Sequence, residues 1–319
     1  MTKIDGFLSD IHTLAVLGHV RPDGDCVGST MAIFNYVTDN YPQIKVQVYL
    51  GSFSEELAEN VPGCGSICFE APEEAPVYDL CISIDCSTLD RLDQFRPVFD
   101  RASSTLCIDH HMTNRGFADA NVIDGDASSA CEVLYTLLDP EKISQRTADC
   151  LFTGIVHDTG CFCHENTSAA TLRIAGDLIE KGARASELIF NTFSSHTFKQ
   201  IKLIGRALHQ ADLEYDGRVI ISLMTYEDML ADQGRPMDVE PVIDEMRVAK
   251  GVRCAVFARE NADGSWRGSL RANGDMNVAQ VAERFGGGGH LRAAGCTLYG
   301  NKEEVRRSLL DAVGEALAK

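Results

Sequence analysis

Apolar runs of strand length alternate with helical patterns through the first half of the chain. Four such runs, each bounded by turn residues, cover residues 13–19, 44–50, 79–85 and 105–109. Apolar positions recur with a helical period over residues 27–38, 128–138, 145–157 and 167–181. Strand, helix and strand at this spacing predict a parallel sheet with helices on both faces.

The second half begins with a helical pattern over residues 197–210, which Ser194 and Ser195 precede as a cap and linker. Further strands are predicted over residues 217–225, 252–260, 264–273 and 296–299, and helices over 277–285 and from residue 302. A chain of 319 residues can bury two hydrophobic cores. We therefore expect a first domain over residues 1–193, a linker helix over 194–211 and a smaller domain over 212–319.

Polar residues stand at the ends of three of the predicted strands. His19, Asp85 and Asp109 each end an apolar run. Because ligands of open parallel sheets bind outside the carboxyl ends of the strands, we expect these side chains to meet at one edge. Two further polar stretches, HVRPDGD at residues 19–25 and HDTG at residues 157–160, are expected to join them there.

So many carboxylates at one sheet edge predict a metal site. Neighbouring carboxylates raise each other's pKa values, and divalent cations remove this repulsion. A mixture of carboxylate and imidazole donors suits Mn²⁺ best, with Mg²⁺ or Co²⁺ as alternatives.

Motifs in both halves of the chain occur in a fixed order. They are HxxxDxD at His19, Asp23 and Asp25, the single strand-end Asp85, the DHH triplet Asp109-His110-His111, Asp158, GSLRAN at residues 268–273, and RFGGGGHLRAAG at residues 284–295. With these motifs the sequence resembles the DHH phosphoesterases that carry a C-terminal DHHA1 domain, from His19 to the closing helix. Within that family it is most similar to the subgroup of nanoRNases and pAp phosphatases.

The resemblance implies a fold and a metal set. The fold is α/β: an N-terminal parallel-sheet DHH domain, a linker helix and a smaller C-terminal α/β DHHA1 domain, with the active site in the cleft between them. Two Mn²⁺ ions are implied, one held by His19, Asp23 and Asp85, the other by Asp25, His110, Asp158 and the shared Asp85. The resemblance also implies hydrolysis by hydroxide attack assisted by both ions. The implied catalytic residues are Asp109, expected to orient a ligand histidine, and His111, expected to face the phosphate.

The second domain is expected to bind the far end of the substrate. Consecutive glycines let backbone N–H groups approach an anion without an intervening side chain. The implied substrate-binding residues are Arg271, Gly286, Gly287, Gly288, Gly289 and His290. Metals at one end and this clamp at the other would favour dinucleotides over long chains.

The charge of the chain is unevenly distributed. Its net charge is −18, from 29 Lys and Arg and 47 Asp and Glu. The last 74 residues, from Met246, instead hold 12 basic and 8 acidic residues, a net +4. This balance argues against long duplex nucleic acid as a partner and suits a short RNA or nucleotide substrate.

Composition favours a cytoplasmic protein with no membrane partner. The apolar run near the N-terminus follows acidic residues and lacks a cleavage site for a signal peptidase, and no apolar stretch is long enough to cross a bilayer. The 12 cysteines are interpreted as reduced core residues. Neither Cys64 with Cys68 nor Cys161 with Cys163 has a second pair at zinc-site spacing.

The expected function is Mn²⁺-dependent hydrolysis of very short RNA to 5′-mononucleotides, removal of phosphate from 3′-phosphoadenosine 5′-phosphate (pAp), or both. A phosphodiesterase of cyclic or linear signalling dinucleotides is the first alternative. A manganese inorganic pyrophosphatase fits less well, because bare pyrophosphate needs no nucleotide clamp. A processive single-strand DNA exonuclease and a non-catalytic nucleotide sensor are disfavoured by the acidic charge and by the intact metal motifs, respectively. A homodimer is compatible with the sequence.

Several residues near the motifs have two interpretations. Asn114 and Arg115 either shape the loop after DHH or touch substrate. Ser128 and Ser129 are N-caps that could also receive phosphate. Trp266 either packs in the core or stacks on a base.

The remaining histidines carry weaker expectations. His157 could support the site from behind Asp158. Surface or capping positions are expected for His12, His164, His196 and His209.

Overall fold

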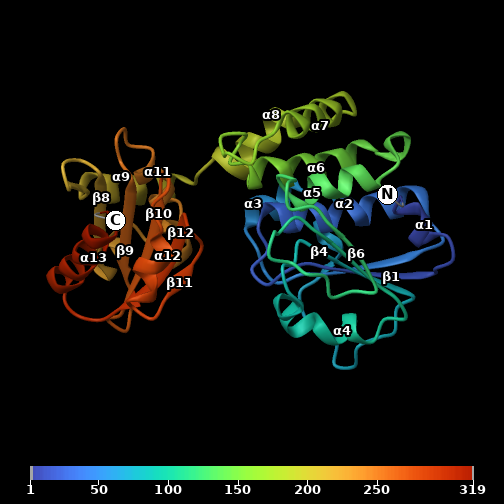
Figure 1. The fold of residues 1–319 in the computed structure, drawn as a ribbon, viewed down its shortest axis with the longest axis horizontal. Helices are drawn as coiled ribbons and strands as arrows, with labels where there is room; N and C mark the ends of the chain where they lie inside the picture. The colour runs from blue at the N-terminus through green and yellow to red at the C-terminus, as the bar shows by residue number, and fades with distance from the viewer. Residues whose placement is uncertain (1–2, 318–319) are drawn as a thin grey trace. The chain divides into compact units, whose positions relative to one another are not determined.

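A computed structural model describes residues 3–317, and the chain divides into two compact units, Met1–Ser195 and His196–Lys319 (Figure 1). The strands of the first unit are β1 (Thr13–Leu17), β2 (Lys45–Tyr49), β3 (Ile67–Cys68), β4 (Leu80–Ile84), β5 (Thr105–Asp109) and β6 (Ala120–Ile123). Its α-helices are α1 (Asp5–Leu8), α2 (Gly24–Asn40), α3 (Glu55–Asn60), α4 (Arg96–Asp100), α5 (Ala130–Leu137), α6 (Gln145–Asp158), α7 (Ala169–Glu180) and α8 (Ala185–Leu188). Shorter helical turns are η1 (Cys64–Ser66), η2 (Leu89–Phe95), η3 (Pro140–Lys142) and η4 (Ile189–Ser194).

The first sheet is entirely parallel, with strand order β3-β2-β1-β4-β5-β6. The order reverses between β1 and β4, because β1 is followed along the sheet by β2 on one side and by β4 on the other. In open α/β sheets this switch point opens a crevice at the carboxyl ends of the two strands. His19 follows β1 and Asp85 follows β4, so the topology places both residues there.

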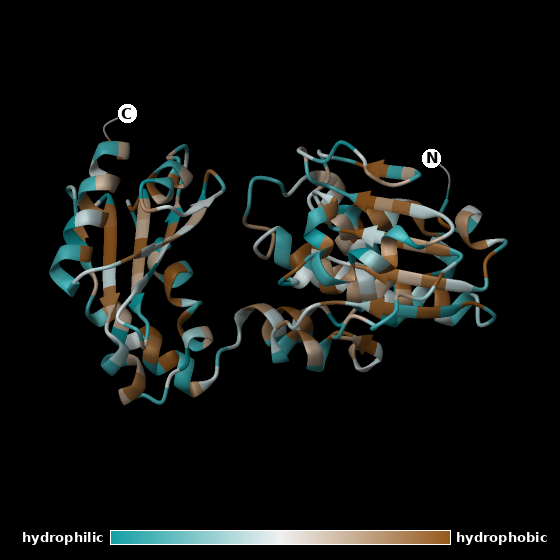
Figure 2. Cartoon of the chain, turned by 90° about the horizontal axis from the view of Figure 1, so that it is seen from below, coloured by the Kyte–Doolittle hydropathy of each residue, from teal (hydrophilic) through white to brown (hydrophobic). Residues whose placement is uncertain are grey.

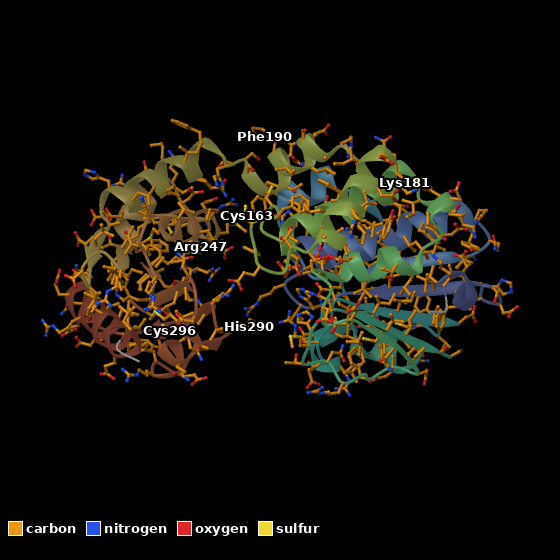
Figure 3. All side chains as sticks on the ribbon, turned by 45° about the horizontal axis from the view of Figure 1, so that its top comes forward. Cys163, Lys181, Phe190, Arg247, His290 and Cys296 are labelled. Atoms are coloured by element: carbon orange, nitrogen blue, oxygen red, sulfur yellow. The ribbon has the colours of Figure 1, made fainter. Side chains whose placement is uncertain are left out.

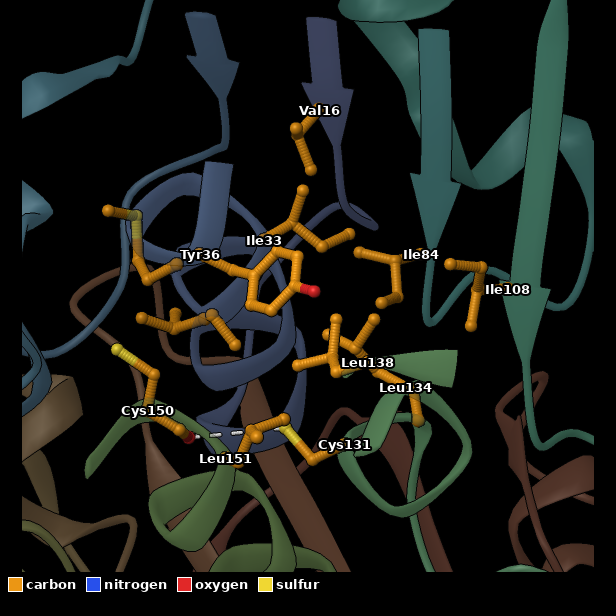
Figure 4. Close-up of a cluster of buried hydrophobic side chains, with 14 of the residues drawn as sticks. Val16, Ile33, Tyr36, Ile84, Ile108, Cys131, Leu134, Leu138, Cys150 and Leu151 are labelled. Atoms are coloured by element: carbon orange, nitrogen blue, oxygen red, sulfur yellow. Dashed lines mark hydrogen bonds between the residues drawn. The ribbon is translucent and has the colours of Figure 1, made fainter. Parts of the chain in front are cut away.

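Residues alternate between two cores along each central strand. Leu14 and Val16 of β1 face a core that includes α2, α5 and α6, whereas Ala15 and Leu17 face a second core with η2 and α4. Figure 4 shows side chains of β1, β4 and β5 meeting those of α2 and α5 in the first core. Burial on both faces explains why these strands are continuous apolar runs, which appear as hydrophobic segments in Figure 2.

The second unit is a mixed sheet with helices on both faces. Its strands are β7 (Asp212–Glu214), β8 (Val219–Met224), β9 (Cys254–Glu260), β10 (Trp266–Ala272), β11 (Gly288–Gly289) and β12 (Ala293–Leu298), in the order β11-β12-β10-β9-β8-β7. Its helices are α9 (Phe198–His209), α10 (Tyr226–Ala231), α11 (Val242–Arg247), α12 (Val278–Glu283) and α13 (Lys302–Leu317), with the turn η5 (Pro236–Val239). Helix α9, at the predicted linker, belongs to this unit and packs with β8, η5 and α11.

The predicted α/β fold class is confirmed, and helix caps account for the shifted boundaries. Helix α2 begins at Gly24 because Asp23 caps it, and α5 begins at Ala130 because Ser129 caps it. The short strands β3, β6, β7 and β11 were absent from the prediction, since two to four residues carry too little periodicity.

Two further findings concern composition. The 12 cysteines are free, and nine of them are buried, as expected of reduced core residues. Within residues 3–317, no helix combines the length and the hydrophobicity needed to cross a membrane.

Candidate metal centre

His19 and Asp23 form the first part of the site, in the turn between β1 and α2. The Nδ1 of His19 lies 2.7 Å from the carbonyl oxygen of Val20, and since a carbonyl only accepts, Nδ1 carries the proton. Nε2 is then the ring nitrogen that faces the carboxylates, 3.7 Å from Oδ2 of Asp23 and 3.3 Å from Oδ2 of Asp85. The other carboxylate oxygen of Asp23 accepts from the N–H groups of Asp25 and Cys26 and caps α2.

Asp25 is fully buried between two helices. It lies in the first turn of α2, and its two carboxylate oxygens accept from the first N–H groups of α5, those of Ala130 (2.6 Å) and Cys131 (3.0 Å). A helix N-terminus stabilises a negative charge. Oδ2 of Asp25, which accepts from Ala130, also lies 3.9 Å from Nε2 of His110. The carboxylate is therefore fixed by backbone donors and still faces a candidate ligand histidine.

Asp85 faces different histidines with its two oxygens. Oδ2 lies 3.3 Å from Nε2 of His19, and Oδ1 lies 3.6 Å from Nε2 of His110 and 3.7 Å from Nδ1 of His111. Its backbone is in the left-handed region, with φ 57°, which a non-glycine residue adopts at a cost of about 1–3 kcal/mol. A strained, buried carboxylate between two imidazoles is an arrangement suited to bridging two cations.

His110 and Asp158 complete the second group. Nε2 of His110 lies 3.2 Å from Oδ2 of Asp158, which is the last residue of α6. Helix α6 comes close to the site because it crosses α2 at two glycines. A Cβ at Gly28 would lie 2.6 Å from the carbonyl oxygen of Cys150, and one at Gly154 would lie 2.7 Å from Oδ1 of Asp25.

Asp109 holds His111 and not His110. Its Oδ1 accepts from Nδ1 of His111 at 2.8 Å, and its Oδ2 accepts from Nδ2 of Asn114 at 2.7 Å. From His110 it receives only the backbone N–H, at 2.9 Å. The expectation that Asp109 orients the ring of the ligand histidine His110 is therefore corrected, because the turn after β5 points the ring of His110 toward Asp25, Asp85 and Asp158. Asn114 shapes the loop: it also donates to the carbonyl of Cys86.

The electrostatics of the site show an excess of negative charge. Burial alone would lower the pKa of His19, but its contacts with Asp23 and Asp85 raise it well above the ordinary value. Burial likewise opposes protonation of His110, yet Asp85, Asp25 and Asp158 raise its pKa to about 10. Burial and the charge of neighbouring carboxylates raise the pKa values of Asp25 and Asp158. Each of these pKa values is raised by neighbouring carboxylates. Bound cations would offset the repulsion between those carboxylates.

Within residues 3–317, candidate ligand atoms gather in three groups, each within 4.8 Å. The groups are His19 with Cys26 and Asp85; Asp85 with His110 and His111; and Asp25 with His110 and Asp158. Asp85 and His110 each belong to two groups, so the structure brings the predicted residues into one continuous cluster. Cys26 was missed in the sequence. Burial raises the pKa of its thiol to about 12, and its sulfur accepts from the N–H of His19, so we assign it to packing.

His157 packs behind the HxxxDxD turn. A Cβ at Gly24, between Asp23 and Asp25, would lie 2.1 Å from Cγ of its ring, so only glycine fits there. Nε2 of His157 lies 3.0 Å from Oγ1 of Thr192, and burial lowers the pKa of this imidazole to about 4. A neutral histidine therefore supports the turn that presents both carboxylates.

The second unit holds a separate cluster of arginines. Arg271 lines a pocket of about 240 Å³ on one face of the sheet, together with Arg259 of β9, and Arg267 and Ser269 of β10. Arg267 pairs with Arg259 across the two strands, and alternation brings Arg267, Ser269 and Arg271 to the same face. Burial lowers the pKa of Arg259. The sequence prediction named Arg271 alone, although the period-two pattern along β10 is a signal that could have identified Arg267.

The four-glycine stretch is more ordered than a loop. Gly286 has φ 66°, and Gly288 and Gly289 form β11, which pairs with β12. A Cβ at Gly287 would lie 2.2 Å from the carbonyl oxygen of Gly295, so the glycine is required by close backbone approach. The stretch thus ends in an edge strand of the sheet, and His290 after it is exposed at the surface of the second unit (Figure 3).

Contacts identify structural roles for the two serines and for Trp266. Ser129 caps α5 by accepting from the N–H of Glu132, and Ser128 donates to the Glu132 carboxylate. Trp266 is buried in the second core and donates to the carbonyl of Gly300, which identifies it as a packing residue. Arg115 is exposed.

The other histidines lie outside the cluster. Among them His12, His164 and His209 are exposed, whereas His196 is partly buried with Nε2 3.9 Å from Glu245. Nδ1 of His164 lies 3.2 Å from the carbonyl oxygen of Asp158.

Comparison with known proteins gives matches over both units. Residues 13–155 match the DHH family, N-terminal domain, and residues 216–319 match the DHHA1 domain. The bifunctional oligoribonuclease and PAP phosphatase NrnA of Bacillus subtilis is 28% identical over 316 residues, covering 97% of this chain and 96% of that protein. Its namesake from Thermus thermophilus is 24% identical over 314 residues, covering 94% and 89%.

Two further matches carry other names. The cyclic-di-AMP phosphodiesterase GdpP of Geobacillus thermodenitrificans is 27% identical over 91% of this chain and 45% of that protein. The crystal structure of an exopolyphosphatase-related protein from Bacteroides fragilis superimposes with a TM-score of 0.89 at 23% identity, over 98% of this chain and 95% of that one, and so shares the fold.

Proposed function

The chain belongs to the DHH family, with a C-terminal DHHA1 domain, and is a phosphoesterase; from this premise we propose that it is a Mn²⁺-dependent enzyme that hydrolyses very short RNA and pAp. The observation that carries the two-cation part of this proposal is the orientation of Asp85, whose oxygens face His19 on one side and His110 on the other. The names of the relatives from Bacillus subtilis and Thermus thermophilus support the substrate class.

The donor set fits two divalent cations. In our proposal His19, Asp23 and Asp85 hold one cation, and Asp25, His110, Asp158 and Asp85 hold the other. Four carboxylates and two imidazoles suit Mn²⁺, and Mg²⁺ and Co²⁺ are the nearest alternatives. Bound cations would lower the pKa of a water nucleophile and neutralise charge on the phosphoryl oxygens.

His111 is proposed as the catalytic residue beside the cations. Because Nδ1 donates to Asp109, Nε2 is free to act on the phosphate or the leaving oxygen. The ring is partly exposed, which substrate contact requires, whereas Asp109 is fully buried. Asp109 thus acts as a positioning residue that fixes both the tautomer and the direction of the imidazole.

The second unit is proposed to bind the end of the substrate remote from the scissile bond. Three arginines around a pocket of about 240 Å³ provide charge and planar donors for a phosphate group. Arg271, the backbone of Gly286 to Gly289 and His290 are the residues that we assign to this role, joined by Arg259 and Arg267. The clamp favours short substrates without reading their base sequence.

A signalling-dinucleotide phosphodiesterase is the second candidate. The likeness to the cyclic-di-AMP phosphodiesterase of Geobacillus thermodenitrificans supports it. A manganese inorganic pyrophosphatase is less well supported, because pyrophosphate leaves the arginine pocket without a ligand. The free thiols of the chain support a cytoplasmic location.

Rates on a panel of substrates test the proposed function. With Mn²⁺ present, we expect an RNA dinucleotide and pAp to be hydrolysed at least about tenfold faster than a 20-nucleotide RNA, a difference of about 1.4 kcal/mol in transition-state binding. A cyclic dinucleotide and pyrophosphate complete the panel. Preference for the cyclic dinucleotide would favour the second candidate. Equal rates on the dinucleotide and the long RNA would contradict length selection.

Metal binding is expected to strengthen as the pH rises. Before a cation binds, the surrounding carboxylates hold the pKa of His110 at about 10, so this imidazole is protonated at pH 7 and its proton must leave when the cation enters. Each displaced proton makes the apparent Kd for Mn²⁺ fall about tenfold per pH unit below that pKa. Calorimetric titrations at pH 6, 7 and 8, in two buffers of different ionisation enthalpy, count the protons released.

A histidine outside the cluster provides the control. His12→Gln changes an exposed imidazole immediately before β1 and should leave the number of released protons unchanged. Affinity that is independent of pH in the unaltered chain would show that His110 is not a ligand.

A further inference from the structure

Three exposed arginines follow the same three strands whose ends build the metal cluster. Arg21 lies in the turn after β1, Arg91 in the helical turn η2 after β4, and Arg115 in the loop after β5. These strands are neighbours in the sheet, in the order β1-β4-β5, so the three connections begin at one edge. We call Arg21, Arg91 and Arg115 the loop arginines. The proposed metal chemistry uses none of them.

Hydrogen bonds join the three connections to one another. The N–H of Val20 donates to the carbonyl oxygen of Arg91 at 2.8 Å, which ties the turn after β1 to η2. The side chain of Asn114 donates to the carbonyl oxygen of Cys86 at 3.0 Å, which ties the loop after β5 to the segment after β4. The same side chain donates to Asp109. The backbones that carry the loop arginines therefore form one hydrogen-bonded rim at the edge where the candidate ligands lie.

The backbone of Arg21 is held in an unfavourable conformation. Its φ of 55° lies in the left-handed region, which costs a non-glycine residue about 1–3 kcal/mol. The turn is fixed on one side by the hydrogen bond of Val20 and on the other by Asp23, which caps α2. Strained residues concentrate at functional sites, because the rest of the fold must hold them in place. The strain at Arg21, like that at Asp85, points to a functional role for this turn.

The loop arginines have no ion-pair partner among residues 3–317, although their unit is strongly acidic. Residues 1–195 contain 12 Lys and Arg against 29 Asp and Glu. Arg21 forms no pair even with Asp23, whose side chain is 59% exposed two residues away. Other arginines of the unit do pair with carboxylates, namely Arg96, Arg101, Arg146 and Arg184. Three guanidinium groups without a partner in the described part of the chain therefore lie at the edge of the sheet that carries the metal cluster.

The charge of the first unit gives these guanidinium groups a role. A phosphate ester that approaches the candidate metal centre meets an excess of acidic residues, and two divalent cations would offset only four of those charges. Positive side chains at the mouth of a site attract anions and raise association rates by about 10- to 10³-fold, an effect that falls steeply with ionic strength. Arginines kept free of ion pairs at this edge are suited to that task.

We propose that the loop arginines form an anion-recruiting site on the first unit, which draws phosphate esters to the candidate metal centre and holds a phosphate group there. The ligand class is a small phosphorylated molecule that carries at least two negative charges. The site is distinct from the arginine pocket of the second unit, because all its residues lie within Met1–Ser195. The proposal rests on the proposed function in one respect, namely that the recruited ester is the substrate.

Calorimetric titration with inorganic phosphate tests the site without any hydrolysis. The full chain is titrated at low ionic strength, with and without Mn²⁺, and elemental analysis measures the bound metal. We expect Arg21→Gln, Arg91→Gln and Arg115→Gln each to raise the Kd for phosphate at least about threefold, and the triple variant at least about thirtyfold. Metal content and Tm should stay unchanged, because none of these side chains is a candidate metal ligand.

Arg173→Gln is the matched control. Arg173 is also exposed and also lacks an ion pair within the described residues, and it lies on α7, so its substitution removes the same charge from a different element. This variant should keep the Kd for phosphate within about 1.5-fold of the original value. An effect of Arg173→Gln equal to that of the loop arginines would show that only the net charge of the unit matters, and would overturn the proposal.

The salt dependence of kcat/KM measures recruitment directly. For whichever ester of the substrate panel the unaltered chain hydrolyses, kcat/KM should fall as NaCl rises from about 20 to about 200 mM. The triple glutamine variant should lose most of this dependence with little change in kcat, whereas a triple lysine variant keeps the charge and should restore the dependence to within about twofold.

Two results would overturn the proposal. One is a triple glutamine variant that binds phosphate as tightly as the unaltered chain. The other is a triple lysine variant whose salt dependence matches that of the glutamine variant, since the arginines would then have a merely structural role. Failure of the unaltered chain to bind Mn²⁺ or to hydrolyse the panel would contradict the proposed function instead, because the phosphate titration judges the loop arginines without a catalytic step.

Discussion

For the proposed Mn²⁺-dependent hydrolysis, we expect Asp85→Asn to lower kcat/KM by about 10³-fold or more, equivalent to about 4 kcal/mol of transition-state stabilisation. Asparagine tolerates the left-handed backbone that Asp85 adopts, so the fold should survive. The amide keeps only one oxygen, which faces either His19 or His110 but not both. The substitution should therefore lower the amount of bound metal with little change in the Tm of the protein.

Measurement of bound Mn²⁺ by elemental analysis, alongside activity and Tm, distinguishes the two effects. Occupancy is expected to fall from two ions per chain to one or none. Asp93→Asn is a matched control, because Asp93 is also a non-glycine residue at positive φ, 46°, and it is exposed outside the metal cluster. Near-normal turnover with two bound ions in Asp85→Asn would refute the bridging assignment.

Strand ends explain why so much of this site was predictable from the sequence. In a doubly wound sheet each apolar run delivers its following residue to one edge, so His19, Asp85 and Asp109 had to be neighbours once the strands were identified. The position of Asp158 cannot be inferred from strand ends, because this residue lies at the end of a helix. Its position depends on how closely α2 and α6 pack, and the sequence signals this only through Gly28 and Gly154.

The sequence predicted less well the residues whose positions do not follow from strand ends. The direction of a side chain after a strand depends on the turn it enters, and the turn after β5 sends the two DHH histidines in different directions: His110 toward the carboxylates, His111 toward Asp109. The arginine pocket depends on the register of β10 against β9. The sequence of one strand alone does not determine the register in which it pairs with another. The alternation of residues along a strand shows which side chains share a face. The residues that lie next to that face depend on how the strands are ordered in the sheet.

Asp109→Asn is expected to lower kcat by about 10²- to 10⁴-fold while leaving metal content nearly unchanged, since loss of a carboxylate that holds a catalytic imidazole has effects of this size. The buried carboxylate accepts from His111 and Asn114, whereas an amide presents an N–H to one of these donors. The imidazole of His111 then loses its fixed tautomer. Substrate binding does not depend on that tautomer, so KM should change little.

A double-mutant cycle decides whether Asp109 acts through His111. If it does, Asp109→Asn in a His111→Ala background should cost less than about threefold, because the group it positions is already gone. Asp119→Asn is the control: Asp119 accepts from Thr105 at the opposite end of the same strand, β5, so its loss perturbs the strand without touching the site. Additive losses of kcat in the double variant would mean that Asp109 supports the whole turn after β5. The proposal that Asp109 acts by positioning His111 would then be contradicted.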